Sequence, residues 1–366
     1  MISKRVKSFE SKEVRRIFEV ASRINNPIDL SIGEPNFDIP DEIKNEAIRH
    51  IQKGFNKYTH SSGLEELRDE LVKKIKSKNN IKLDNNQISL TPGISGGLLV
   101  TSLTIFDRDD EVIILDPYFP TFPELVKLSE AKPVYVSTYP SFSLPLEKIE
   151  KALTKNTKAI VINSPNNPTG VVYPESDLRS LVNIAKKQDL IIISDEIYED
   201  YVYEGKHFSV GSIYENTVSL WGFSKTYGMT GWRLGYLTGP EIFMEKVHDL
   251  VKYLFFSPSS IPQKAAIKAL KIGPPREILS SFKSKRNFVM ENLSNKYKIM
   301  GAQGSYYMFF EVPRGDADKY LEQIMKKKLF VFPGKIFSQR NTHIRISFSA
   351  DLKILKRAIS IMNSVV

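Results

Sequence analysis

The feature that most constrains the fold is an alternation of short apolar runs with helical patterns between residues 88 and 238. Each run is rich in β-branched residues and is followed by Gly, Pro, Asn or Ser. The seven runs span residues 88–90, 112–115, 134–136, 159–162, 190–193, 218–221 and 234–237. Near-continuous apolar runs are typical of strands buried on both faces. We therefore predict an α/β fold with a mostly parallel, seven-stranded sheet covered by helices.

The segments that flank this alternation have a different pattern. Amphipathic helices are predicted at residues 42–52, 64–78 and 175–188, whereas the part after about residue 270 reads as helix 277–293, strands 306–311 and 343–348, and a final helix from 351. A chain of 366 residues exceeds the size at which single cores stop growing, roughly 250 to 300 residues. We predict a large α/β domain at 46–269 and a small α+β domain formed by 1–45, which includes an N-terminal arm, and 270–366.

The composition argues against several classes of protein and of site. The chain has no cysteine and five scattered histidines, so we expect no disulfide and no metal site. No stretch is apolar enough to cross a membrane, and the charged N-terminus lacks the features of a signal peptide, which favours a cytoplasmic protein. The net charge of +10 suits an anionic cofactor, an anionic substrate or nucleic acid. The basic run at 326–328 follows a helical pattern and is interpreted as a solvated helix face.

Polar residues that follow the strands are the candidates for chemistry, because ligands bind beyond the carboxyl ends of strands in open α/β sheets. The Gly-rich turn at 91–97 before an apolar helix predicts either a phosphate cradle or a plain tight turn. Asp195 ends a strand and either meets a cation or caps a following helix. Lys225 directly follows another strand, and a lysine partly withdrawn from water is a competent nucleophile for Schiff-base chemistry.

The segment 222–236, Gly-Phe-Ser-Lys-Thr-Tyr-Gly-Met-Thr-Gly-Trp-Arg-Leu-Gly-Tyr, resembles the cofactor-lysine segment of the class I/II aminotransferases. These are pyridoxal phosphate (PLP) enzymes of fold type I and include aspartate aminotransferase. Further matching segments occur in family order at residues 33–35, 57–59, 63–68, 167–170, 195–198, 333–334 and 345–348. The resemblance therefore covers nearly the whole chain.

The resemblance implies a role for several residues around the cofactor ring. Lys225 should carry PLP as a Schiff base, and Asp195 should pair with the pyridine nitrogen. Asn167 and Tyr198 should hydrogen-bond the phenolic oxygen of the ring, and Phe119 should stack on its face. Lys225, Asp195 and Tyr198 are thus the expected catalytic residues.

It also implies residues for the phosphate and the substrate. The phosphate should be held by the residues Ile94, Ser95, Ser224, Arg233 and, from the partner subunit of a homodimer, Tyr58. Arg345 should grip the substrate carboxylate, the backbone of Gly33 should close over the other side, and Asn167 should also contact the substrate. The chain departs from the family at Gly222, where a serine is frequent, and at Gly96, where a longer polar residue is common.

The function implied is a ping-pong transfer of an amino group from an L-amino acid of the aspartate or aromatic type to a 2-oxo acid such as 2-oxoglutarate, with Lys225 as proton shuttle. A PLP-dependent carbon–sulfur β-lyase is the alternative within the fold. A nucleic-acid-binding regulator is the alternative of another class, and the absence of a basic stripe argues against it. The sequence does not assign the donor amino acid.

Overall fold

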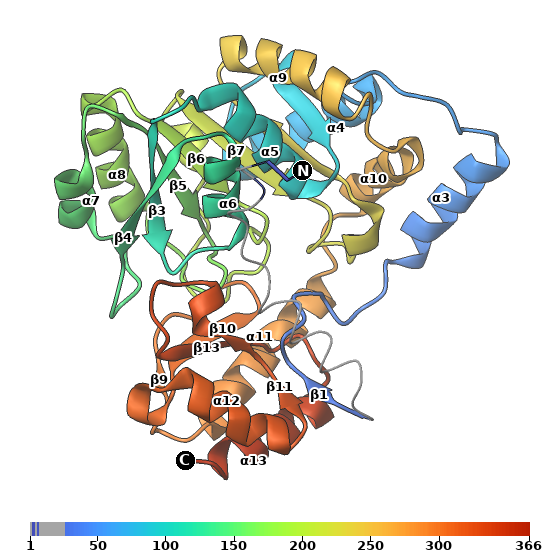
Figure 1. Ribbon diagram of the computed structural model, residues 1–366. Coiled ribbons are helices and arrows are strands. Elements are labelled where there is room, and N and C mark those ends of the chain that lie inside the picture. The colour runs from blue at the N-terminus through green and yellow to red at the C-terminus, as the bar shows by residue number, and fades with distance from the viewer. Residues whose placement is uncertain (1, 4–5, 7–25) are drawn as a thin grey trace.

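The computed structural model describes residues 2, 3, 6 and 26–366, and its larger lobe is built on one seven-stranded sheet (Figure 1). The strand order is β2-β8-β7-β6-β5-β3-β4. β8 is antiparallel to both neighbours, and the other pairs are parallel. The strands are β2 (Ile88–Thr91), β3 (Glu111–Asp116), β4 (Lys132–Ser137), β5 (Thr157–Asn163), β6 (Ile191–Asp195), β7 (Thr217–Gly222) and β8 (Gly235–Thr238). The predicted mostly parallel, seven-stranded sheet is confirmed.

Helices cover both faces of this sheet, as the apolar runs require. In β3, Ile113 and Leu115 join one core cluster, whereas Val112 and Ile114 join another, because successive side chains of a strand point to opposite faces. α7 (Leu146–Ala152) and α8 (Glu175–Lys187) cover the first face, and α5 (Gly93–Ile105), α6 (Thr121–Leu128) and α9 (Glu241–Leu254) cover the second. The helix predicted at 175–188 is α8.

A third core cluster lies at the β2 end of the sheet. It contains residues of α3 (Asp41–Gln52), α4 (Glu65–Lys74) and α10 (Ser260–Ile272) packed against β2 and β8. The predicted helix 42–52 is confirmed, whereas the helix predicted at 64–78 ends as an α-helix at Lys74 and continues as a π-helical turn, Ile75–Asn79. Sequence analysis did not predict α9 or α10.

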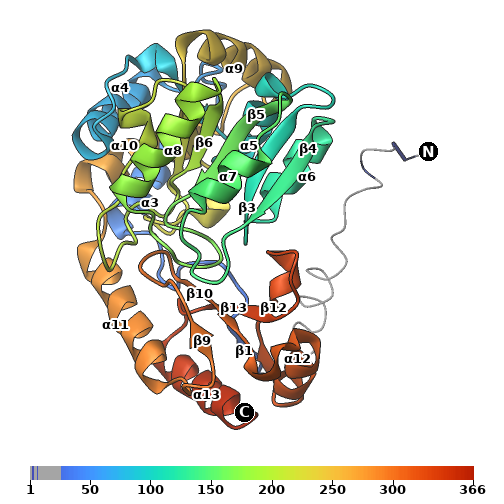
Figure 2. The ribbon, with the colours of Figure 1, turned by 90° about the vertical axis from the view of Figure 1, so that its left-hand side faces the viewer.

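The smaller lobe is an α+β unit below the large sheet (Figure 2). A four-stranded antiparallel sheet has the order β12-β13-β10-β9, with β9 (Lys298–Ile299), β10 (Tyr307–Glu311), β12 (Phe332–Pro333) and β13 (His343–Ser347). α11 (Arg276–Asn292), α12 (Ala317–Lys326) and α13 (Leu352–Asn363) accompany it. These elements confirm the helices and strands predicted after residue 270.

The chain enters the small lobe twice. β1 (Ile28–Asp29) pairs in parallel with β11 (Leu329–Phe330), so residues that are some 300 positions apart form one short ladder. Residues 30–40 then lead from the small lobe to α3 beside the large sheet. Residues 1, 4–5 and 7–25 of the predicted N-terminal arm lie outside the described residues.

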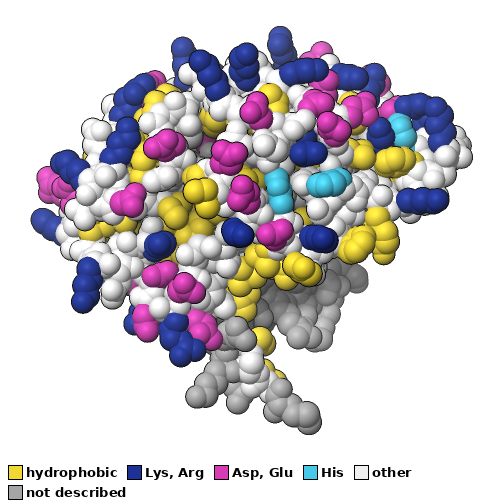
Figure 3. Space-filling view, turned by 90° about the horizontal axis from the view of Figure 1, so that it is seen from above, with side chains coloured by type: hydrophobic (Ala, Val, Ile, Leu, Met, Phe, Trp, Pro, Cys, Tyr) yellow, Lys and Arg dark blue, Asp and Glu magenta, His cyan; other side chains and the backbone are white. Residues whose placement is uncertain are grey.

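Two features considered from the sequence, a membrane-spanning helix and a basic surface stripe, can be examined in the structure. Across the part of the chain that the structure describes, no helix is both long and apolar enough to span a bilayer. On the face seen in Figure 3, the described Lys and Arg side chains are interspersed with Asp and Glu and form no continuous stripe. This distribution is typical of an ordinary solvated surface.

Candidate active site

A cavity of about 680 Å³ lies where the carboxyl ends of the large-sheet strands face the small lobe. All but one of the predicted site residues line it: Gly33, Ile94, Ser95, Phe119, Asn167, Asp195, Tyr198, Ser224, Lys225, Arg233 and Arg345. Tyr58 does not line it and is 80% exposed. Apart from Tyr58, the residues predicted from the sequence therefore lie together in one pocket, although they span more than 300 positions of the chain.

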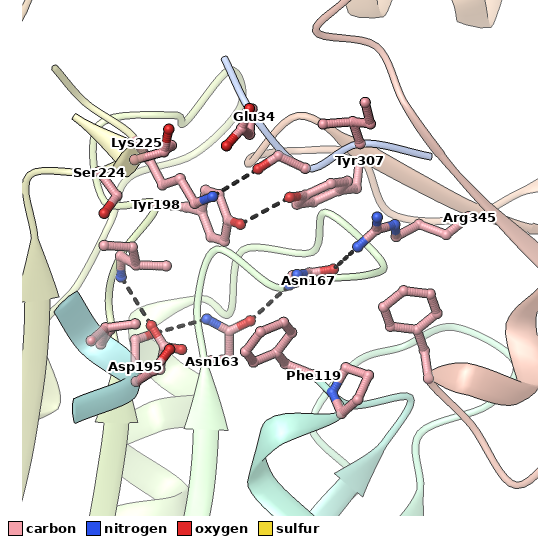
Figure 4. Close-up of a pocket in the computed structure, with 18 of the residues that line it drawn as sticks. Glu34, Phe119, Asn163, Asn167, Asp195, Tyr198, Ser224, Lys225, Tyr307 and Arg345 are labelled. Carbon is pink, nitrogen blue, oxygen red and sulfur yellow. Dashed lines mark hydrogen bonds between the residues drawn. The ribbon is translucent and has the colours of Figure 1, made fainter. Parts of the chain in front are cut away.

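Lys225 is half-buried and follows β7 by three residues. Its amine donates to the carbonyl oxygen of Gly33 at 2.7 Å (Figure 4). The hydroxyl of Tyr201 donates to the backbone carbonyl of Lys225 at 2.7 Å and fixes the loop that carries it. The side chain therefore reaches across the pocket from a firmly held backbone.

Asp195 ends β6 and is 3% exposed. Its Oδ1 accepts the N–H of Ile197 at 3.1 Å, and burial raises the pKa of the carboxyl group to about 7. The chain after Asp195 forms turns, so the interpretation as a cap of a following helix is wrong. A buried carboxyl group with a raised pKa is stabilised in its ionised form by a cation brought beside it.

The start of α5 forms a cradle with β8. A Cβ atom on Gly235 would lie 2.6 Å from the carbonyl carbon of Gly93 and 2.7 Å from the nitrogen of Ile94, so only glycine allows this approach. A Cβ atom on Gly93 would lie 2.6 Å from Nη2 of Arg233, which shows how closely that guanidinium approaches the helix start. Helix N–H groups beside a guanidinium and the Ser224 hydroxyl fit the phosphate of PLP.

Gly222 departs from the family for a visible reason. A Cβ atom there would lie 2.9 Å from Cδ1 of Ile197 and 3.3 Å from the carbonyl oxygen of Leu234. A serine would therefore require its neighbours to shift.

Two asparagines connect Asp195 with the opposite side of the pocket. Asn163 donates through Nδ2 to the backbone carbonyl of Asp195 at 3.0 Å and accepts the N–H of Asn167 at 2.7 Å. Asn167 in turn accepts from Nη1 of Arg345 at 3.1 Å (Figure 4). Sequence reasoning missed Asn163. Its position at the last residue of a buried strand was the signal available.

Arg345 on β13 is 4% exposed, and burial lowers the pKa of its guanidinium. Nη2 donates to the carbonyl oxygen of Ser31 at 2.6 Å, while Nε has no hydrogen-bond partner among the described residues. The guanidinium lies 4.3 Å from the ring centre of Tyr307 and 4.5 Å from that of Phe337. Within residues 26–366 no carboxylate pairs with it, so this buried cation is suited to bind an anionic group of a ligand.

Tyr307 is a second residue that sequence reasoning missed. Its hydroxyl lies 3.1 Å from that of Tyr198, and burial, reinforced by this neighbour, raises the pKa of Tyr198 well above its usual value. Tyr307 begins β10, a strand that was predicted, but which of its residues face the pocket depends on its pairing with β13. That register is not readable from the sequence.

The fold and this pocket define a PLP-dependent enzyme of fold type I. A sequence model of the family described as aminotransferase class I and II matches residues 25–361. The chain therefore belongs to the class I and II aminotransferases. It is a PLP-dependent enzyme that transfers amino groups between amino acids and 2-oxo acids.

Individual relatives resemble the chain over its full length. It is 32% identical to a probable aspartate aminotransferase of Methanocaldococcus jannaschii, with 100% of both chains covered. It is 36% identical to aromatic-amino-acid aminotransferase 2 of Thermococcus litoralis, with 100% of this chain and 98% of the relative covered. The solved structure of Thermus thermophilus aspartate aminotransferase with maleate superposes with a TM-score of 0.95 at 31% identity and covers 100% of both chains.

Proposed function

We propose that this pocket transfers the amino group of an L-amino acid of the aspartate or aromatic type to a 2-oxo acid such as 2-oxoglutarate, with Lys225 as the residue that carries PLP. The observation that carries the proposal is the presence, in one cavity, of the Lys225 amine and the buried Arg345 guanidinium, which pairs with no carboxylate of residues 26–366. When bound, PLP supplies an electron sink for the negative charge that develops at the substrate Cα.

The residues around the cavity suit each part of the cofactor. Asp195 would pair with the ring nitrogen, since a cation beside its buried carboxyl group stabilises the anion. Asn167 and Tyr198 would contact the phenolic oxygen, and Phe119 would cover a ring face. The cradle residues Ile94, Ser95, Ser224 and Arg233 would hold the phosphate.

The chain's own residues then bind the substrate and move its proton. Arg345 and Asn167 would grip the substrate carboxylate, which fixes the Cα–H bond relative to Lys225. Once the substrate's amino group has taken its place on PLP, the freed Lys225 amine would remove this proton as a base and give it back as an acid. The Gly33 carbonyl, 2.7 Å away, would accept a hydrogen bond from the amine between these steps.

The side chains that line the cavity favour an aromatic amino acid as the donor of the amino group. Apolar side chains form much of the wall: Ile32, Phe119, Pro120, Phe332, Ile336 and Phe337. The cations that the described residues contribute to the lining are Lys225, Arg233 and Arg345, each of which already has a proposed task. Mixing the PLP-loaded enzyme with each of the twenty amino acids, and recording which ones discharge the cofactor band, tests the donor class.

A homodimer is part of the proposal, with Tyr58 reaching the phosphate of the partner subunit. Tyr58 and Phe256 contact each other with ring centres 4.4 Å apart, yet they are 80% and 57% exposed. Tyr253 nearby in the sequence is 83% exposed. Exposed aromatic side chains grouped in this way are typical of a surface that another chain covers.

The deciding experiment compares the wild type with Lys225→Ala. We expect the variant to lose the absorbance band of lysine-bound PLP and its transaminase activity together; normal transamination without the lysine would contradict the proposal. The family and the relatives named above give the carbon–sulfur lyase alternative no support, and incubation with cystathionine checks it, because a lyase releases pyruvate and ammonia without an acceptor.

Two further expectations remain proposals. The division into 46–269 and 1–45 with 270–366 is supported by a core cluster that joins Ile28 and Leu30 to residues after 280. This cluster also contains Ile197, Tyr198, Tyr201 and Tyr203 of the large lobe, and the boundary at 45 falls inside α3. Limited proteolysis followed by mass spectrometry of the fragments tests the division. A cytoplasmic location remains a prediction from the sequence.

A further inference from the structure

One side chain of the small lobe, Tyr307, contacts both Tyr198 and Arg345 in the pocket. Tyr307 on β10 is 1% exposed, and its hydroxyl lies 3.1 Å from the hydroxyl of Tyr198 in the large lobe. Its ring centre lies 4.3 Å from the guanidinium carbon of Arg345. Figure 4 shows Tyr307 between these two residues.

The surroundings of Tyr307 leave it little freedom to move. The ring packs against that of Tyr306 with centres 4.7 Å apart and meets the ring of Tyr198 edge-on at 5.7 Å. A Cβ atom on Gly33 would lie only 2.4 Å from the Tyr307 hydroxyl, so the backbone at residue 33 also passes close to it. A side chain held from several sides can hold its neighbours in turn.

We propose that Tyr307 is a positioning residue for both ends of the reaction. Its hydroxyl orients and polarises Tyr198, and its ring face supports Arg345 through a cation–π contact. The inference rests on the proposed function, in which Tyr198 contacts the phenolic oxygen of PLP and Arg345 binds the substrate carboxylate.

The direction of the hydroxyl effect follows from counting protons. A phenol has one proton, and when Tyr198 donates it to the cofactor oxygen, the Tyr198 oxygen can only accept from Tyr307. This second hydrogen bond makes Tyr198 a stronger donor, because linked hydrogen bonds polarise one another. A stronger donor favours the ionised cofactor oxygen, so the pair lowers the pH at which lysine-bound PLP loses its proton.

The first test removes the hydroxyl alone. We expect Tyr307→Phe to raise the midpoint of the pH titration of the lysine-bound PLP absorbance by about 0.4 to 1 pH unit, the size of one hydrogen bond. Binding of 3-phenylpropionate, a carboxylate without an amino group, should stay within about twofold, because the ring under Arg345 remains. This midpoint is a property that a merely structural role would leave unchanged.

A matched control exists in the core of the same lobe. Tyr297 and Tyr320 form another buried hydroxyl pair, 2.7 Å apart, and neither lines the cavity. Tyr320→Phe makes the same chemical change away from the pocket and should leave both the titration midpoint and 3-phenylpropionate binding as in the wild type.

The second test removes the ring face. Tyr307→Leu should also weaken 3-phenylpropionate binding about fivefold to thirtyfold, the range from an exposed to a desolvated cation–π contact. Tyr307→Met carries the same expectation if the leucine variant does not fold. A Tyr307→Phe midpoint equal to that of the wild type and Tyr320→Phe would overturn the hydroxyl role, and unchanged binding in the ring-deleted variant would overturn the ring role. Normal transamination by the Lys225→Ala variant would instead contradict the proposed function.

Discussion

The amine of Lys225 and the backbone carbonyl of Gly33 are joined by a hydrogen bond of 2.7 Å across the pocket. The same carbonyl accepts the hydroxyl of Tyr306 at 2.9 Å. Gly33 lies on the stretch that links β1 of the small lobe to α3 beside the large sheet. The path of this stretch and the position of the lysine are therefore coupled.

Gly33→Ala should disturb that coupling. The added Cβ atom would lie 2.4 Å from the Tyr307 hydroxyl, so the stretch has to move away from the pocket. We expect kcat/KM to fall by about tenfold to a hundredfold, since small displacements of positioned groups have effects of this size. Steady-state kinetics with a reactive donor measures it.

A double-mutant cycle identifies the cause of that loss. The ring carbon next to the hydroxyl would lie 3.4 Å from the new Cβ atom, an ordinary contact, so Tyr307→Phe removes most of the clash. In the Tyr307→Phe background the substitution Gly33→Ala should cost much less than in the wild type. Equal costs in the two backgrounds would show that the clash is not the reason.

Gly235→Ala should weaken cofactor binding. The new Cβ atom would force the start of α5 away from β8 and open the cradle. We expect the Kd for PLP to rise at least about tenfold, as for the loss of one charge-assisted hydrogen bond. Gly239→Ala is the control, because its Cβ atom would lie 2.6 Å from the Phe243 ring at the far end of β8. An equal loss of affinity in both variants would point to general destabilisation.

In the cofactor-free protein, the contribution of Asp195 to stability should fall as the pH rises from about 4 to 7. Burial raises the pKa of Asp195 from 3.8 to about 7 in the folded state, so between these values the folded chain binds more protons than the unfolded chain. This contribution to the free energy of unfolding then decreases with rising pH and levels off above pH 7. Asp195→Asn should remove this contribution. The free energy of unfolding of the variant, relative to that of the wild type, should therefore increase by about 2 to 3 kcal/mol from pH 5 to pH 8.

Urea unfolding of the two cofactor-free proteins at both pH values measures this increase. Asp316→Asn serves as control, because Asp316 lies on the surface and its pKa is lowered by hydrogen bonds with Lys319. A difference between Asp195→Asn and the wild type that is the same at pH 5 and pH 8 would contradict the assignment to Asp195.

Mixed dimers test whether Tyr58 acts across the subunit interface. Lys225→Ala and Tyr58→Ala subunits should each form weakly active or inactive homodimers. In a mixed dimer, the subunit that keeps Lys225 meets an intact Tyr58 from its partner, so one site is complete and activity should recover. No recovery after co-refolding, with mixed dimers verified by mass spectrometry, would place the action of Tyr58 within its own subunit or exclude it from the site.

The sheet and the chemistry at its edge were predictable for a physical reason. Runs such as 190–193 are apolar because both faces of the strand are buried, and the residue at the end of such a strand, here Asp195, faces the ligand edge in any α/β sheet. Lys225 was found in the same way. The resemblance to a family supplied the contributions from distant segments, such as Gly33 and Arg345.

What could not be predicted depends on pairings between distant segments. Tyr307 faces the pocket because β10 pairs with β13 in one register, which places Phe309 opposite Arg345, and a shift by one residue would turn Tyr307 away. The two-residue strand β1 is too short to show any periodicity and exists only through its pairing with β11. Asn163 gains its position from hydrogen bonds to Asn167 and Asp195.

The pairing of β1 with β11 has a consequence for biogenesis. During synthesis the strand at residues 28–29 has to wait for its partner at 329–330, while the large sheet and the helices packed on it are complete once residue 272 has emerged. Domains fold as units during translation, beginning from the N-terminus. The lysine and the phosphate cradle can therefore form on the nascent chain well before Arg345 arrives, so a newly made subunit can acquire its cofactor before it can recognise a substrate.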